Sequence, residues 1–530
     1  MAGTKIRDGY LTINSTRIIN KRKIKSCFFS SFFMSIKSLT IVFICLILLS
    51  GCFTNRNASI LTKRYPKEEL LEDYEIAEKI LTSKHPSLYW YTSEDSMQLY
   101  FEKYKTAISD SLTEQEFVWK VLSPLINKIH CGHTSVSQSV VYAKQYNRAK
   151  KQSFPLLIKI WNDTMVVTGS LSKTNAIIPK GAVIRSINNI DAHTIIQLML
   201  DKLPTDGYAD VVNYIRISFN FPYYFNNTFG VINNYNIDFN DSSGKAQHII
   251  VPAFDPLKDT IKTKKGTSPV STTSALSKRK RKLLGYRSLE IDSSGYFATM
   301  RINTFSKGKL RSFYRKSFRS LRKKNIQHLI VDIRLNGGGR VYASTLLTKY
   351  FADKKFKIAD SIYANTNTLR PFIKYFKNGF FNEMQLRLIS KRKNDNRFHQ
   401  IRYETTTFSP KKRNHFNGNV YVLTSGPTFS ASCLFANIVR HQNNITLLGE
   451  ETGGGWYGNS GIMIPSFELP HTKVNIRMPL FRVVLSNHVS QKGTGILPEI
   501  LVGPTYDAVI KGYDRKWNAA KSLILKNIGK

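Results

Sequence analysis

The spacing of apolar residues predicts helices in the first part of the chain. From residue 67 onward, apolar side chains recur every three or four positions, which is the period of amphipathic helices. Thr113 and Glu116 have the spacing of a capping box at the start of one helix, and Pro124 predicts a kink or break in it. Gly132, in "HCGHTSV", predicts the end of this helical stretch and the start of a short strand. We therefore expect an N-terminal helical domain over residues 67–145.

The next stretch, residues 150–255, alternates apolar and polar positions and predicts a β-rich module. "FPLLIKIWNDTMVVTGS" predicts two strands joined at Asn162-Asp163, and "IPKGAVIRSINNIDAHTIIQLMLDKL" predicts a strand, a tight turn and a helix. The order of glycine, strand, turn and helix resembles a PDZ domain, a class that binds extended peptides by strand addition. The aromatic-rich stretch 208–254 predicts further β-structure.

Strands and helices alternate from residue 288 to 510. "GYFATMRINTF", "FYRKSFRSLRKKN" and "HLIVDIRLNGGG" predict a strand, a helix and a buried strand, an order typical of a parallel sheet. We expect an α/β multidomain protein that combines the N-terminal helical domain, the PDZ-like module and a mostly parallel βαβ core. Residues 256–287 form a predicted basic linker, and residues 511–530 a helical tail.

The most informative feature of the composition is its strong positive charge. The 530 residues carry 78 Lys+Arg against 36 Asp+Glu, a formal net charge of +42, while 42% hydrophobic and 12% aromatic residues are typical of a globular protein. Such charge favours nucleic acid or an anionic membrane as a partner. The densest basic run, "SKRKRK" at 277–282, has no nucleic-acid-binding motif beside it, so we expect a solvated loop there and no nucleic-acid partner.

The N-terminus favours the membrane. "SLTIVFICLILLSGC" has an apolar core of about a dozen residues, which is short for a spanning helix and typical of a signal peptide. Its end resembles a bacterial lipobox, which implies cleavage before Cys52 and lipid attachment to that residue. We expect residues 1–51 to be a signal region, with Met34 as a second plausible start, and 52–66 a tether. The mature chain would then be anchored in the bacterial envelope, at the outer membrane and outside the cytoplasm; an uncleaved anchor helix is the alternative.

Five motifs in a fixed order carry a family resemblance. Three of them are "HLIVDIRLNGGGR", "TSGPTFSASCLFANI" and "LLGEETGGG"; "HCGHTSV" precedes them and "GTGILPEILV" follows. Together they resemble the tail-specific or C-terminal processing proteases, peptidase family S41. The resemblance implies a serine endopeptidase that hydrolyses extended or unfolded polypeptides through an acyl-enzyme. It implies no cofactor, and no His/Cys/Asp cluster in the sequence has metal-ligand spacing.

The expected nucleophile is Ser430, where a strand passes into a helix. A hydroxyl at this position faces the crevice outside the strand ends, beside the free N–H groups of a helix N-terminus. The alternative is an ordinary N-cap serine, and the neighbouring Ser432 is expected to be structural. The resemblance implies that the glycine turn, at Gly338 and Gly339, and the amide of Ala431 supply the oxyanion donors.

A serine nucleophile also needs a base. Many S41 members use a lysine 25 residues after the serine, and that position here is Gly455. Another branch of the family uses a histidine from the N-terminal helical region, which His133 matches. We therefore expect Ser430 to act with His133, and not with the nearby His130.

The third catalytic group has no clear candidate. The place where the histidine-using branch carries an acid holds Gln491 and Lys492, so Glu450 and Glu451 are weak substitutes, with Glu499 a further one. This departure leaves a second hypothesis open, a non-catalytic peptide-binding lipoprotein that has kept the fold.

Two cysteines flank the expected catalytic residues. Cys131 lies two residues before His133, and Cys433 lies three after Ser430. If the two catalytic residues meet, these thiols could form a disulfide, and two buried free thiols are the alternative.

Overall fold

The computed structural model describes residues 60–172, 178–259, 276–440, 442–486, 489 and 493–529. Met1–Asn57 and Ala58–Lys530 are separate units. The predicted signal region and Cys52 lie outside the described residues, so their prediction stays open. No described helix combines the length and apolarity needed to cross a bilayer.

The N-terminal helices form as their spacing predicts. The Thr113 side chain accepts from the Glu116 N–H and the Glu116 carboxylate accepts from the Thr113 N–H, so the predicted capping box is present. Pro124 is the second residue of α5, and the chain remains helical through Leu122 and Ser123, so the predicted kink or break takes the form of a change from π-helix to α-helix at this position. The helical stretch ends at Asn127 instead of Gly132, because the chain turns at His130, which has φ of 53°. The elements are β1 (Arg64–Tyr65), α2 (Lys67–Lys84), α3 (Glu94–Thr106), β2 (Leu112–Thr113), α4 (Glu114–Glu116), η1 (Phe117–Leu122), α5 (Ser123–Asn127), β3 (Ser135–Ser137) and α6 (Val140–Arg148).

The β-rich module follows with its own apolar core. Asn188 and Asn189 both have positive φ and form the expected tight turn. The prediction of β-structure throughout 208–254 is wrong for its first part, which forms two helices that bury apolar side chains against the sheet. The sheet order is β4-β5-β6-β8-β9. Its elements are β4 (Leu156–Trp161), β5 (Thr164–Ser170), β6 (Val183–Ile187), β7 (Ile190–Asp191), α7 (Ala192–Leu200), α8 (Val211–Phe219), α9 (Phe221–Phe229), β8 (Asn234–Asn240) and β9 (Ala246–Pro252).

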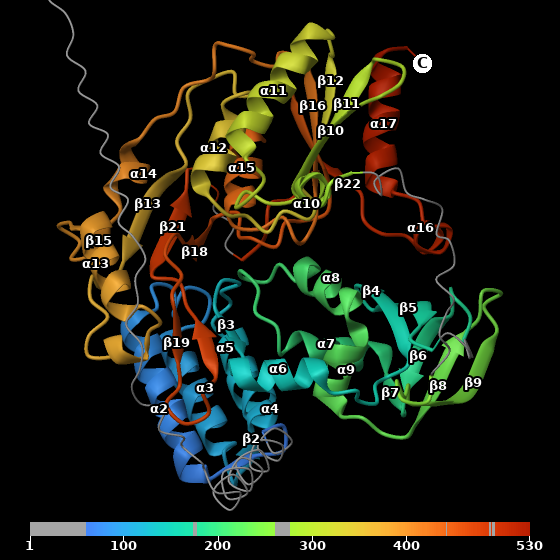
Figure 1. The fold of residues 1–530 in the computed structure, drawn as a ribbon, viewed down its shortest axis with the longest axis vertical. Coiled ribbons are helices and arrows are strands. Elements are labelled where there is room, and N and C mark those ends of the chain that lie inside the picture. Colours follow the sequence, from blue (N-terminus) through green and yellow to red (C-terminus); the bar gives the residue numbers. More distant parts are fainter. Residues whose placement is uncertain are drawn as a thin grey trace, which may run out of the picture. The chain divides into compact units, whose positions relative to one another are not determined.

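The α/β core is built on a six-stranded sheet in the order β10-β11-β12-β16-β17-β22. All neighbouring pairs are parallel except β10 with β11, which confirms the mostly parallel core. Helices α11, α12 and α15 cover one face of the sheet and α17 covers the other (Figure 1). The elements are α10 (Lys278–Tyr286), β10 (Arg287–Ile291), β11 (Phe297–Ile302), α11 (Leu310–Lys323), β12 (His328–Asp332), α12 (Val341–Thr348), β16 (Asn419–Thr424), α15 (Ala431–Val439), β17 (Ile445–Gly449), β22 (Ile500–Leu501), α16 (Tyr506–Lys511) and α17 (Arg515–Asn527).

A second sheet, in the order β14-β15-β13-β21-β18, connects this core to the N-terminal helices. A hairpin, β19 with β20, pairs antiparallel with β3, and the surrounding side chains share one apolar cluster with α2, α3 and α5. The elements are β13 (Ala359–Ala364), η2 (Ile373–Tyr375), α13 (Gly379–Ile389), β14 (Lys391–Arg392), β15 (Phe398–His399), α14 (Ile401–Thr405), β18 (Gly458–Gly461), β19 (Ser466–Glu468), β20 (Asn475–Arg477) and β21 (Phe481–Leu485).

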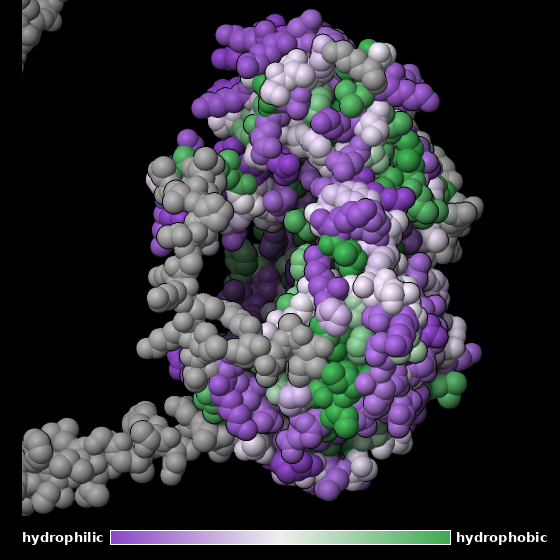
Figure 2. Space-filling model, turned by 90° about the vertical axis from the view of Figure 1, so that its right-hand side faces the viewer, coloured by the Kyte–Doolittle hydropathy of each residue, from purple (hydrophilic) through white to green (hydrophobic). Residues whose placement is uncertain are grey.

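The basic run at 277–282 is helical and not a loop. Ser277 accepts a hydrogen bond from the Lys280 N–H and caps α10, none of whose residues is buried. A capping serine followed by long side chains with good helix propensity explains the difference. Hydrophilic residues cover most of the face shown in Figure 2, as expected for so charged a chain.

Candidate active site

Ser430 occupies a strained turn between β16 and α15. Its φ of 57° and ψ of −122° lie far from the regions that side chains other than glycine prefer. It stands at the N-cap position of α15, but its side chain makes no capping hydrogen bond. Backbone strain of this kind costs about 1–3 kcal/mol and is concentrated at functional sites. The geometry therefore disfavours the N-cap interpretation and leaves the hydroxyl available for another partner.

The glycine turn after β12 packs directly on Ser430. Gly338 has φ of +92°, and a Cβ built on it would lie 2.8 Å from Ser430 Cβ and 2.9 Å from Ala431 N. The Gly338 N–H donates to Asn336 Oδ1 (3.0 Å) and is not free to serve as an oxyanion donor. Within the described part of the chain, the N–H groups of Gly339 and Ala431 have no hydrogen-bond partner. Those two amides are the available donors beside the hydroxyl.

The ion pairs of Arg334 support the same turn from its N-terminal side. Arg334 forms ion pairs with Asp332 (2.8 Å) and with Asp514 (2.6 Å), and Asp514 is the N-cap of α17. The carboxylates raise the pKa of the Arg334 guanidinium. The turn is thereby tied to the helix on the far face of the sheet.

His133 lies beside the segment that carries Ser430, and no hydrogen bond joins the two side chains. Its ring packs on that of Phe429, the residue before Ser430, with the centroids 4.7 Å apart. The structure gives no hydrogen bond between His133 and Ser430, and the buried Nδ1 has no partner among the described residues. Burial, assisted by Arg477 and Arg216, lowers the pKa of His133 to about 3, so the ring is neutral at pH 7. A neutral imidazole can accept a proton, but the ring of His133 packs on Phe429, the residue before Ser430.

His130, the histidine not chosen, is engaged elsewhere. Its Nδ1 lies 2.9 Å from the carbonyl oxygen of Gly207, to which it donates, and its ring packs 4.7 Å from that of Tyr208. Both contacts fix the loop that follows α7.

Asp206, which the sequence analysis did not identify, is the central buried acid of the site. It is 2% exposed, and it accepts the N–H of Gly132 (2.8 Å) on one oxygen and that of Gly455 (3.3 Å) on the other. Burial raises the pKa of Asp206 to about 7. This one carboxyl joins the loop that carries His133 to the glycine turn after β17. Its segment, "PTDGYAD", has no motif, and its partners come from distant parts of the chain.

The packing around Gly455 leaves no room for a lysine base at this position. A Cβ at Gly455 would lie 2.2 Å from the carbonyl oxygen of Gly458. No side chain fits there without a backbone shift, so the serine–lysine arrangement is excluded by the local packing as well as by the residue itself.

The predicted acids have other structural partners. Glu450 accepts from Ser425 Oγ (2.9 Å) and pairs with Lys516 (2.5 Å). Glu451 accepts from the Gly495 N–H (2.7 Å), and Glu499 accepts from the Leu447 N–H (2.7 Å). None of these carboxylates forms a hydrogen bond with His133 within the described residues. The position of Gln491 and Lys492 lies outside those residues.

The predicted disulfide between Cys131 and Cys433 is absent. Both cysteines are free and buried. The Cys433 thiol donates to the Thr428 carbonyl (3.2 Å), and burial raises the pKa values of Cys131 and Cys433 to about 11 and about 12. Each thiol has its own polar neighbours, and the nearby Asp206 also raises both pKa values. Groups of three or more potential metal ligands do not occur in the part of the chain that the structure describes.

The strained serine, the glycine turn against it and the buried histidine together are typical of a serine hydrolase site. Residues 296–502 match the model of peptidase family S41. The structure is similar to that of mature CPAF, with 12% identity and a TM-score of 0.57 over 88% of this chain and 99% of that one. It is also similar to mature CPAF complexed with lactacystin, with 12% identity and a TM-score of 0.56 over 86% and 98% of the two chains. At this identity the likeness shows a shared fold. No curated protein sequence matches the chain.

Proposed function

We propose that this chain is a serine peptidase that cleaves extended or unfolded polypeptides through an acyl-enzyme on Ser430. The observation that carries the proposal is the strained backbone of Ser430, whose hydroxyl forms no capping hydrogen bond and whose Cβ lies against the glycine turn. The match of residues 296–502 to family S41 supports the reaction class. The β-rich module, interpreted as PDZ-like from its sequence, would hold the substrate as an added strand.

The proposed chemistry has two half-reactions. The Ser430 oxygen attacks the scissile carbonyl carbon, its proton passes to a base, and the developing oxyanion is stabilised by the amides of Gly339 and Ala431. The C–N bond then breaks, the leaving amine takes the proton, and water hydrolyses the acyl-enzyme by the same route.

His133 is the proposed base, after a local rearrangement. Its neutral ring rests against Phe429, so it reaches Ser430 only when that side chain or the loop of His133 shifts. Catalytic contacts in unliganded sites are often long and tighten when substrate binds. The proposal therefore includes activation by the substrate.

A fluorophosphonate probe tests the nucleophile directly. We expect the full-length protein to be labelled on Ser430, the Ser430→Ala variant to remain unlabelled, and the Ser432→Ala variant to be labelled as well as wild type. Ser432 is a matched control because it is fully buried and its hydroxyl has no partner among the described residues. Labelling that persists in Ser430→Ala would contradict the assignment.

A non-catalytic peptide-binding protein is the second candidate. Among the described residues, His133 forms no hydrogen bond with Ser430 or with a carboxylate, and this favours the second candidate. In that case the probe labels no variant, while unfolded polypeptides still bind.

We also propose that lipid on Cys52 anchors the chain to the bacterial envelope. The lipobox-like end of the apolar segment supports this proposal. Cys52→Ala is expected to move the protein from the membrane fraction to the soluble fraction after a high-salt wash, which removes purely electrostatic binding. Cys45→Ser, within the same apolar segment, is expected to leave the protein on the membrane; an identical distribution of both variants would disprove the anchor.

A further inference from the structure

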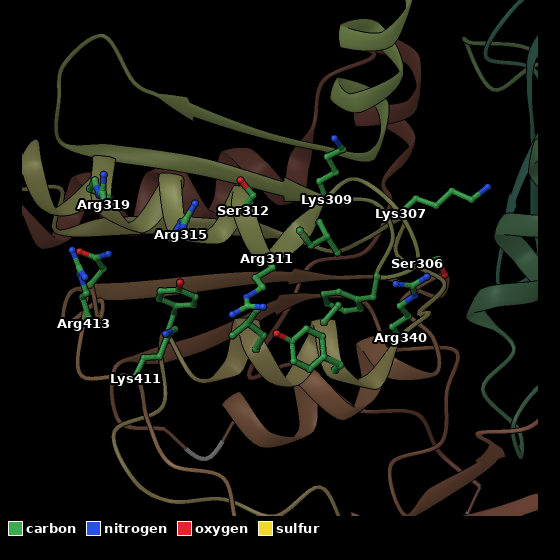
Figure 3. A pocket seen from close by; sticks show the side chains of 17 residues that line it. Ser306, Lys307, Lys309, Arg311, Ser312, Arg315, Arg319, Arg340, Lys411 and Arg413 are labelled. Atoms are coloured by element: carbon green, nitrogen blue, oxygen red, sulfur yellow. The ribbon is translucent and has the colours of Figure 1, made fainter. Parts of the chain in front are cut away.

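A basic groove begins at the glycine turn and runs along α11. Its volume is about 740 Å³, and eight of its seventeen lining residues are Lys or Arg while none is Asp or Glu. Arg311, Arg315 and Arg319 enter from α11, and Lys411 and Arg413 enter from the opposite wall (Figure 3). The floor is apolar and includes Phe305, Leu310 and Leu346.

The basic side chains of the groove are uncompensated. None of the eight forms an ion pair within the described residues. Arg311, Arg315 and Arg319 recur at every fourth position, so they share one face of α11, where neighbouring like charges repel each other and destabilise the helix. A run of repelling cations over an apolar floor is stabilised when an anionic ligand lies in it.

One end of the groove borders the glycine turn that packs on Ser430. Ser306 and Arg340 form one end of it, and both border Gly339: a Cβ there would lie 2.4 Å from Ser306 Oγ, and Arg340 is the next residue. Gly338, on the other side of Gly339, packs on Ser430. A polypeptide held at Ser430 can therefore extend into the groove.

We infer that this groove selects substrates carrying an acidic segment on one side of the scissile bond. The inference rests on the proposed peptidase function, because it assumes that a polypeptide occupies Ser430. Arg311 and Arg319 are about 12 Å apart along the helix axis. An extended peptide advances about 3.3 Å per residue, so roughly four residues span this distance. The substrate would present at least two carboxylates within such a segment.

A peptide fits the groove better than the other anions that a basic surface attracts. The apolar part of the lining suits the backbone and uncharged side chains of an extended chain, and one end of the groove borders the glycine turn beside Ser430. A membrane surface would instead favour basic residues on an exposed face.

Binding is measured with the full-length Ser430→Ala protein, so that no cleavage occurs. The probes are two fluorescein-labelled octapeptides, one with four glutamates and one with glutamines in their place. We expect the acidic peptide to bind at least tenfold more tightly than the glutamine peptide, with strong salt dependence. Arg315→Glu/Arg319→Glu is expected to abolish this preference. Lys316→Glu/Lys323→Glu is the matched control, because it changes the net charge equally on exposed positions of α11 outside the groove.

The outcomes separate this inference from the proposed function. Equal binding of the two peptides, or equal loss in both charge-reversal variants, overturns the inference even if Ser430 is labelled by the fluorophosphonate. Loss of binding to phosphatidylglycerol vesicles alone, with peptide binding kept, would assign the groove to a membrane and also overturn it. Selective loss of acidic-peptide binding supports the groove even if Ser430 proves unreactive.

Discussion

Replacing Gly338 with alanine is expected to lower the labelling rate of Ser430 by about 10²-fold or more and to destabilise the fold. The new Cβ would lie 2.7 Å from the Phe429 carbonyl oxygen, 2.8 Å from Ser430 Cβ and 2.9 Å from Ala431 N. It would press on Ser430, the proposed nucleophile, and obstruct the Ala431 amide, a proposed oxyanion donor; losing one such donor costs about 10²–10³ in rate. The φ of +92° adds about 1–2 kcal/mol for a residue with a side chain. Crowding against backbone adds about 1–3 kcal/mol.

The neighbouring glycine provides the control for this substitution. A Cβ at Gly337 would meet no atom within 4 Å. We expect Gly337→Ala to change the free energy of unfolding by no more than about 0.5 kcal/mol and to leave labelling at the wild-type rate. Thermal unfolding and time-resolved fluorophosphonate labelling measure the two effects. Wild-type labelling of Gly338→Ala would mean that the turn does not contribute to the site.

Asp206→Asn is expected to remove a large pH dependence of stability. Burial raises the pKa of Asp206 from 3.8 to about 7, so between these values the folded chain keeps a proton that the unfolded chain has released. Stability contributed by this group is therefore fully present below about pH 4 and is lost as the pH rises through 7. Three pKa units correspond to about 4 kcal/mol. The asparagine variant, which does not titrate, should lack this loss.

The measurement is the free energy of unfolding in urea between pH 4 and pH 8. The substituted side chain would also present an amide N–H₂ to one of the two backbone N–H donors, which costs about 1–3 kcal/mol at every pH. The slope against pH, and not the absolute stability, is thus the informative quantity. Asp95→Asn, an exposed carboxyl in the first turn of α3, should keep the wild-type slope. If the Asp206→Asn variant retains the wild-type slope, another group must titrate.

Local signals predicted much of the fold. A threonine followed three residues later by a glutamate is a local signal for a helix start, and Thr113 and Glu116 form this capping box. Asparagine tolerates positive φ, which the turn at Asn188 and Asn189 requires. The alternation of apolar strands and amphipathic helices after residue 288 is enough to predict a parallel sheet, and with it the placement of Ser430 between a strand and a helix.

Other features depend on contacts between distant segments and leave no local trace. The aromatic residues at 211–229 have high strand propensity, but packing against the module's sheet makes them helical. Asp206 acquires its role only because Gly132 and Gly455 are brought to it in the fold. Similarly, the nearness of two cysteines in sequence to Ser430 and His133 did not determine whether their thiols would meet.

The pairing of β3 with β20 has a consequence for the order of biosynthesis. Ser137 and Asn475, partners in this pairing, are separated by 338 residues, and the segment carrying His133 immediately precedes β3. A nascent chain emerging from the ribosome therefore lacks the strand that secures this segment until β20 has been translated. The proposed peptidase activity would arise only after that point, which would protect the nascent chain and its neighbours while the residues between β3 and β20 are made.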